Sequence, residues 1–200
     1  MLLPKNTFKI LNFLIRNLDS YNVNQISRKL SLSIGSVHKI LKNLEKLDIV
    51  KSKHIGNAIY YNINFNNDQA LRLSQVIINE DKNNILNENK IARIYSQDLE
   101  KFDSKLMILF GSILTKKDEA EDVDVLFIIK NKNQVKEVNK FCLEISKIRT
   151  KKVNPLIMLE QDFIDNIKKQ NKAVLNLIEY GIALKGEDIF VKAIKNAHKK

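Results

Sequence analysis

The sequence predicts a two-domain α/β (α+β) chain, in which a small helical domain with a β-hairpin precedes a sheet with flanking helices. Three observations support this fold class. Apolar residues recur at helical spacing near the N-terminus. Residues 49–63 read as two strands joined by a turn. Two further apolar strands occur at residues 106–110 and 122–129. The expected division is a first domain at 1–65, a helical linker at 66–104 and a second domain at 105–200.

The N-terminal domain begins with three predicted helices. The first has apolar residues at helical spacing: Phe8, Leu11, Leu14, Ile15 and Leu18. Two shorter helices follow at residues 23–30 and 34–44, and the turn Ser31-Leu32-Ser33 joins them. Ser33 suits the N-cap of the second short helix. The buried stripe expected on that helix is Ile34, Val37, Leu41 and Leu44.

The predicted hairpin at residues 49–63 has Gly56-Asn57 at its tip, a turn-forming pair. Over residues 1–65, ten Lys and Arg residues oppose three acidic ones, which is the charge balance of a nucleic-acid binder. Together, the helices and hairpin of residues 5–65 resemble the winged helix-turn-helix of small transcriptional regulators. The resemblance implies double-stranded DNA as a partner. The expected DNA-binding residues are Ser33, Ser36, Lys39, Lys42, Asn43, Lys51 and Lys53. The alternative is a winged helix that mediates only protein contacts.

The predicted linker reverses the basic trend, because residues 66–104 hold five cationic and seven acidic side chains. Its apolar positions predict one or two helices, interrupted near residues 80–84. An apolar stripe on a linker must be buried against something. Both a homodimer contact and packing onto the chain's own domains fit the pattern.

The most specific motif lies between the two strands of the second domain. Gly111-Ser112 follows the first strand, and Asp122-Val123-Asp124 opens the second. Because strand side chains alternate between faces, the two aspartates point to the same side with Cβ atoms about 7 Å apart. That spacing suits one divalent cation or a closely spaced metal pair, whose open positions substrate phosphates can fill. The alternative is that Ser112 only caps a helix and that both carboxylates are solvated.

Gly-Ser, a short loop and Asp-x-Asp resemble the signature of the minimal branch of the polymerase-β-like nucleotidyltransferases. The resemblance covers residues 105 to about 190. It implies that Asp122 and Asp124 are catalytic and hold Mg²⁺, and that Gly111 and Ser112 bind the phosphates of an NTP substrate, with ATP expected first. It also implies an antitoxin-like activity on a protein acceptor such as a toxin. Lys116 and Lys117, on the following loop, are further candidates for nucleotide binding.

The chain departs from the family pattern at the strand predicted for residues 152–158. Asn154 stands where members of the family often have a third carboxylate, and an amide cannot accept a proton at neutral pH. Pro155 marks this strand as an edge or bulged one. Two hypotheses follow: a DNA-binding regulator with an active nucleotidyltransferase domain, or a regulator in which an inactive domain senses a nucleotide or a partner.

Composition limits the remaining classes. The chain has 200 residues, a formal net charge of +11 and 44% hydrophobic residues, enough for two small cores. The single cysteine, Cys142, excludes an intramolecular disulfide framework. Charged residues interrupt the N-terminal apolar run, so we expect no signal peptide, no contact with a membrane and a cytoplasmic location.

Overall fold

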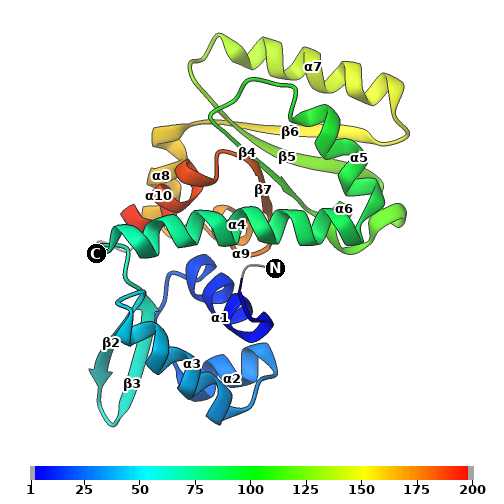
Figure 1. The fold of residues 1–200 in the computed structure, drawn as a ribbon. Helices are drawn as coiled ribbons and strands as arrows, with labels where there is room; N and C mark the ends of the chain where they lie inside the picture. The colour runs from blue at the N-terminus through cyan, green and yellow to red at the C-terminus, as the bar shows by residue number, and fades with distance from the viewer. Residues whose placement is uncertain (1–2, 198–200) are drawn as a thin grey trace. The chain divides into compact units, whose positions relative to one another are not determined.

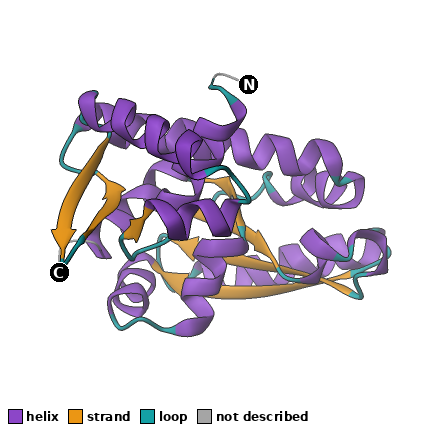
Figure 2. Ribbon diagram, turned by 90° about the horizontal axis from the view of Figure 1, so that it is seen from below, coloured by secondary structure: helices purple, strands orange, loops and turns teal. Residues whose placement is uncertain are grey.

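The computed structural model describes residues 3–197, which form a mixed α/β structure with two separate sheets (Figure 1). The chain divides into two compact units, residues 1–77 and 78–200. The loops that join the helices and strands are short (Figure 2). None of the helices in the described residues is long and apolar enough to cross a membrane.

The first unit contains three helices and a three-stranded antiparallel sheet, and the helix α4 (Asp68–Glu88) begins in it. Its strand order is β1-β3-β2. The elements are α1 (Lys5–Arg16), β1 (Tyr21–Asn22), α2 (Val23–Leu30), α3 (Ile34–Lys46), β2 (Val50–Ile55) and β3 (Ala58–Ile63). The predicted three helices and the hairpin are confirmed. The strand β1 was not expected, because two residues are too few to show a period.

Local capping explains why α2 and α3 meet at the predicted turn. Asn22 caps α2 in a reciprocal capping box with Gln25. Ser31 ends α2 in the left-handed conformation, with φ of 53°. The Ser33 hydroxyl then accepts a hydrogen bond from the Ser36 N–H at 3.3 Å, so the predicted N-cap of α3 is confirmed.

The buried stripe predicted for α3 is confirmed at three positions and wrong at one. Val37, Leu41 and Leu44 are buried, whereas Ile34 is 57% exposed. Side chains on a helix lean toward its N-terminus. Because Ile34 is the first residue of α3, its side chain extends past the start of the helix and no turn before it provides cover.

The second unit is built on a four-stranded sheet of order β6-β5-β4-β7. Its strands are β4 (Leu106–Phe110), β5 (Asp122–Ile129), β6 (Lys152–Leu159) and β7 (Ile182–Lys185). Its helices, beside the end of α4, are α5 (Lys90–Leu99), α6 (Ser112–Thr115), the 3-10 turn η1 (Lys117–Glu119), α7 (Gln134–Ile148), α8 (Glu160–Lys168), α9 (Lys172–Tyr180) and α10 (Glu187–Ala197). The strand β4 is antiparallel to β5 and β7, while α7 connects the parallel pair β5 and β6. Pro155 therefore lies in an edge strand, as predicted.

Helices cover both faces of this sheet. Val123, Val125, Phe127 and Ile129 of β5 join a core that includes buried residues of α4, α5 and α7. The alternate residues of β5, from Asp122 and Asp124 onward, point to the other face, where α8 contacts β5 and β6. The two aspartates thus lie at the start of a strand whose remaining residues are buried.

The predicted interruption of the linker near residues 80–84 is wrong. The helix α4 runs through this stretch, and the break lies at Asn89 instead. The Asn89 side chain accepts a hydrogen bond from the Ala92 N–H and donates one to the Ile113 carbonyl at 2.8 Å. A buried cap that hydrogen-bonds two backbone groups determines where α5 begins. The polar residues at 80–84 do not interrupt α4.

Candidate functional site

The β5 strand displays its two carboxylates on one face, as the alternation of the sequence predicted. Asp122 and Asp124 are half-buried, whereas Val123 and Val125 between and beyond them are fully buried. In the sheet register, Asp124 lies between Phe110 of β4 and Asn154 of β6. The register therefore brings the aspartates beside the end of β4, where the Gly-Ser turn begins.

Gly111 lies directly against Asp124. Its φ is 83°, a conformation that side chains rarely adopt. A Cβ atom at this position would stand 2.5 Å from Oδ2 of Asp124. Glycine is thus required both by the backbone conformation and by the close approach of the carboxylate. The predicted Gly-Ser and Asp-x-Asp motifs meet at this contact.

Ser112 begins α6, and Gly111 occupies the N-cap position of that short helix. The serine is half-buried, and its hydroxyl makes no hydrogen bond with the residues that the structure describes. The alternative role of Ser112 as a helix cap is wrong, because it lies inside the helix rather than before it. Its hydroxyl is therefore available to a ligand.

Asn154 contacts the aspartates from the neighbouring strand. Its Nδ2 donates a hydrogen bond to Oδ2 of Asp122 at 2.7 Å. Burial raises the pKa of Asp124 above its ordinary value, the nearby Asp122 carboxylate raises it further, and hydrogen bonding by Asn154 partly offsets both effects. Two carboxylates that repel each other in a partly buried position favour a bound cation.

The donor set fits a magnesium ion, which is commonly held by one or two carboxylates and its own waters. Asp122 and Asp124 supply the carboxylates, and Gly111 lies close against that of Asp124. Among residues 3–197, no group of three or more His, Cys, Asp or Glu side chains could hold a metal. A third acid is absent from the described site, in keeping with Asn154.

The two lysines predicted for nucleotide binding form no ion pair with Asp122 or Asp124. Lys116 is exposed at the C-terminal end of α6, and Lys117 donates from Nζ to the Glu88 carbonyl at 3.2 Å. Lys152, which was not among the predicted site residues, is the partner of Asp122 in the β5–β6 register and is exposed. Only the parallel pairing of these strands reveals that Lys152 starts on the same face as the carboxylates.

The predicted DNA-binding residues lie along α3 and β2 of the first unit. Ser33, Lys39, Asn43, Lys51 and Lys53 are exposed, while Ser36 and Lys42 are half-buried. Lys42 differs from the others, because its Nζ contacts Oε2 of Glu45 at 2.9 Å. The hydrogen bond to Glu45 is the main reason why the pKa of Lys42 is raised. The charge of Lys42 is therefore already partly neutralised within α3.

Glu45 also connects α3 to the hairpin, since the Ser52 hydroxyl of β2 donates to its Oε1. Hydrogen bonding from Ser52, and secondarily from Lys42, lowers the pKa of Glu45.

A pocket of about 260 Å³ lies in the same unit. Its lining carries no Lys, Arg, Asp or Glu side chain and consists of Asn22, Val23, Asn24, His38, Asn57, Ala58, Ile59 and Tyr61. Uncharged hydrogen-bonding groups thus accompany the cationic residues.

Comparison with known families gives a match within the first unit. Residues 3–51 match a family model described as winged helix-turn-helix DNA-binding. A comparison with curated proteins gave no match. The matched residues include α1, α2 and α3 and the start of β2. The chain therefore carries an N-terminal winged helix-turn-helix DNA-binding domain.

Proposed function

We propose that this protein is a DNA-binding transcription regulator whose second unit is a magnesium-dependent nucleotidyltransferase. The winged helix domain suggests the regulatory role and double-stranded DNA as the partner. The transferase assignment rests on a different part of the chain. Its support is the contact between Gly111 and Asp124, which joins a phosphate-binding type of turn to a pair of metal-binding carboxylates.

Each residue of the site has a distinct role in this proposal. Asp122 and Asp124 would hold Mg²⁺, and the ion would neutralise charge on the triphosphate. Gly111 lets the backbone approach a phosphate closely, and the Ser112 hydroxyl donates to it. Lys152, on the same strand face as Asp122, adds a positive charge near the departing phosphates.

The reaction is attack of an acceptor hydroxyl on the α-phosphorus of an NTP, with ATP expected first. A new O–P bond forms, the bond between the α-phosphorus and the bridging oxygen breaks, and pyrophosphate leaves with the bonding electrons. Asn154 cannot take the proton of the hydroxyl, so that proton passes to water. A protein hydroxyl, such as one on a toxin, is the acceptor that the family resemblance suggests.

The test is transfer from α-labelled NTPs with magnesium onto proteins and RNA of a host lysate. We expect wild type to label an acceptor whose size identifies it, and we expect Asp124→Asn to label none. An exposed acidic residue on the loop before β5, Glu121, provides the matched control as Glu121→Gln. Equal labelling by wild type and Asp124→Asn would contradict the proposal.

A second function is favoured by one observation. The Asn154 amide donates to Asp122, and the described site contains no third acid that could act as a base. A domain of this kind can bind a nucleotide without transferring it and can report its presence to the DNA-binding domain. Nucleotide binding by wild type without any labelling, together with a change in DNA affinity when the nucleotide is added, would support this sensor.

A further inference from the structure

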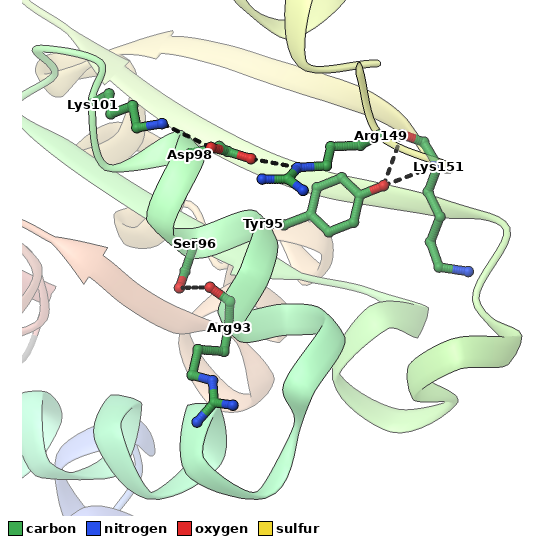
Figure 3. A network of polar contacts seen from close by, with 7 residues as sticks. All are labelled: Arg93, Tyr95, Ser96, Asp98, Lys101, Arg149 and Lys151. Carbon is green, nitrogen blue, oxygen red and sulfur yellow. Dashed lines mark hydrogen bonds and ion pairs between the residues drawn. The ribbon is translucent and has the colours of Figure 1, made fainter. Parts of the chain in front are cut away.

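Outside the carboxylate site, the second unit contains a polar network that ties α5 to the connection between α7 and β6 (Figure 3). Tyr95, which is 1% exposed, donates from its hydroxyl to the Lys151 carbonyl at 3.2 Å and accepts from the Lys151 N–H at 2.7 Å. Both backbone groups of Lys151 are thereby fixed by one buried phenol. The position of Lys151, which directly precedes β6, is therefore set from α5.

A second anchor holds the same connection. Nε of Arg149 donates to Oδ2 of Asp98 at 2.7 Å, and Lys101 contacts the other oxygen at 2.9 Å (Figure 3). The Asp98 carboxylate is buried, and hydrogen bonding from Arg149, then Lys101, lowers its pKa. A buried carboxylate with two cationic partners resists displacement, because removal of either partner leaves charge poorly compensated. Residues 149 and 151 are therefore both attached to α5.

The side chain of Lys151 extends from this anchored segment to the loop that precedes Asp122. Its Nζ donates to the Asp118 carbonyl at 2.7 Å and also to the Ala120 carbonyl. Ala120 is 3% exposed and lies two residues before the first aspartate. An ammonium with two carbonyl acceptors on one short loop fixes where β5 begins.

We infer that Lys151 is a positioning residue for Asp122, and that its contacts with the Asp118 and Ala120 carbonyls set the affinity of the carboxylate pair for a divalent cation. The inference rests on the proposed function, in which Asp122 and Asp124 hold the metal. Asp122 is the aspartate exposed to such control, since it is the first residue of β5 and the first to lose its place if the loop shifts. Asp124 has a strand partner on both sides in the register, Phe110 and Asn154, whereas Asp122 is paired only with β6, through Lys152 in the register and the hydrogen bond from Asn154.

The test uses Mn²⁺ as the probe, with free Mn²⁺ measured by electron paramagnetic resonance in the full chain. We expect Lys151→Met to weaken Mn²⁺ binding by about tenfold, the lower end of the effect of residues that support metal ligands. Lys151→Arg retains a cationic donor and should restore much of that affinity. Lys147→Met provides the matched control, because Lys147 is an exposed lysine near the end of α7.

Hydrogen exchange gives a second readout that a general loss of stability would not reproduce. In Lys151→Met, amides of residues 117–122 should exchange faster while those of β4 stay protected. Unchanged Mn²⁺ affinity in a folded Lys151→Met protein would overturn the positioning role and leave the proposed function standing. Absence of Mn²⁺ binding by wild type, with and without NTP, would overturn both.

Discussion

The predicted DNA-binding surface and the carboxylate site arrange charge in opposite ways. In the first unit, cationic side chains are spread over the exposed faces of α3 and β2, and the one acid among them, Glu45, pairs with Lys42. In the second unit, Asp122 and Asp124 share a partly buried strand face, and no Lys, Arg or His among residues 3–197 forms a salt bridge with either of them. Like charges are tolerated where solvent separates them, but side by side in a partly buried site they imply a ligand of opposite sign.

The largest expected effect comes from removing one of these carboxylates. Asp124→Asn should lower nucleotidyl transfer by at least about 10³-fold, because a metal that stabilises charge in the transition state contributes several kcal/mol. Chelation of magnesium should have the same effect on wild type. The readout is the initial rate of labelling. DNA affinity should stay unchanged in the variant, and a parallel loss of DNA binding would indicate misfolding instead.

The next-largest effect is expected from adding a third carboxylate to the site of Asp122 and Asp124. Asn154→Asp should raise the rate of transfer by about 10²-fold, since a general base typically contributes this much or more. The same change should tighten Mn²⁺ binding and destabilise the metal-free protein, because three carboxylates then repel one another. Single-turnover rates at saturating NTP provide the measurement. A slower reaction with tighter metal binding would show that Asn154 has another role.

On the predicted DNA-binding surface, we expect the charges of Lys39 and Lys42 of α3 to determine DNA affinity. Lys39→Ala should weaken DNA binding for all sequences and reduce the salt slope of the affinity by about 1, as expected for one lost phosphate contact. Glu45→Gln should strengthen binding, because it releases Lys42 from its ion pair. Fluorescence titrations at several salt concentrations distinguish these outcomes. Weaker binding by Glu45→Gln would mean that the hydrogen bond between Ser52 and Glu45 contributes more to DNA affinity than the released charge of Lys42 does.

The smallest expected effect is on stability. The pKa of Asp124 is raised by burial and by Asp122, so this carboxyl binds protons more readily in the folded metal-free protein than in the unfolded chain. Its contribution to stability should therefore rise as the pH falls through the raised pKa, opposite to the contributions of Glu45 and Asp98, whose pKa values are lowered. At neutral pH, Asp124→Asn should increase the free energy of unfolding by up to about 1 kcal/mol, the range for a like-charge pair. Urea unfolding with a chelator measures this, and the difference in stability between wild type and Asp124→Asn should shrink as the pH falls, because protonation removes the charge of Asp124.

Sequence reasoning succeeded where one local rule determines the structure. Strand alternation was enough to place Asp122 and Asp124 on one face, and a serine before an apolar run was enough to place the cap of α3. It failed where the answer depends on tertiary neighbours. The helical run breaks at Asn89 because its buried side chain caps the start of α5. Ile34 is exposed because no turn precedes it in α3 to cover its side chain.

The placement of Lys152 and the network around Lys151 could not be predicted from the sequence for a related reason. Lys152 stands beside Asp122 because β5 and β6 are parallel and in that register, and hydrophobic pattern alone does not specify a parallel register. The Lys151 contacts reach residues 31, 33 and 56 positions away in the chain. The proposed transferase site is therefore predicted from its motif, whereas its supporting contacts emerge only from the fold.

Pro155 has a consequence for how the protein behaves at high concentration. It lies in β6, an edge strand of eight residues. A long open edge invites other chains to extend the sheet, and proline at such an edge removes a donor from the row that an incoming strand would need. Pro155 thus opposes self-association along β6. A chain with threonine at this position should form intermolecular β-structure more readily on storage or heating, even if its fold and its site are intact.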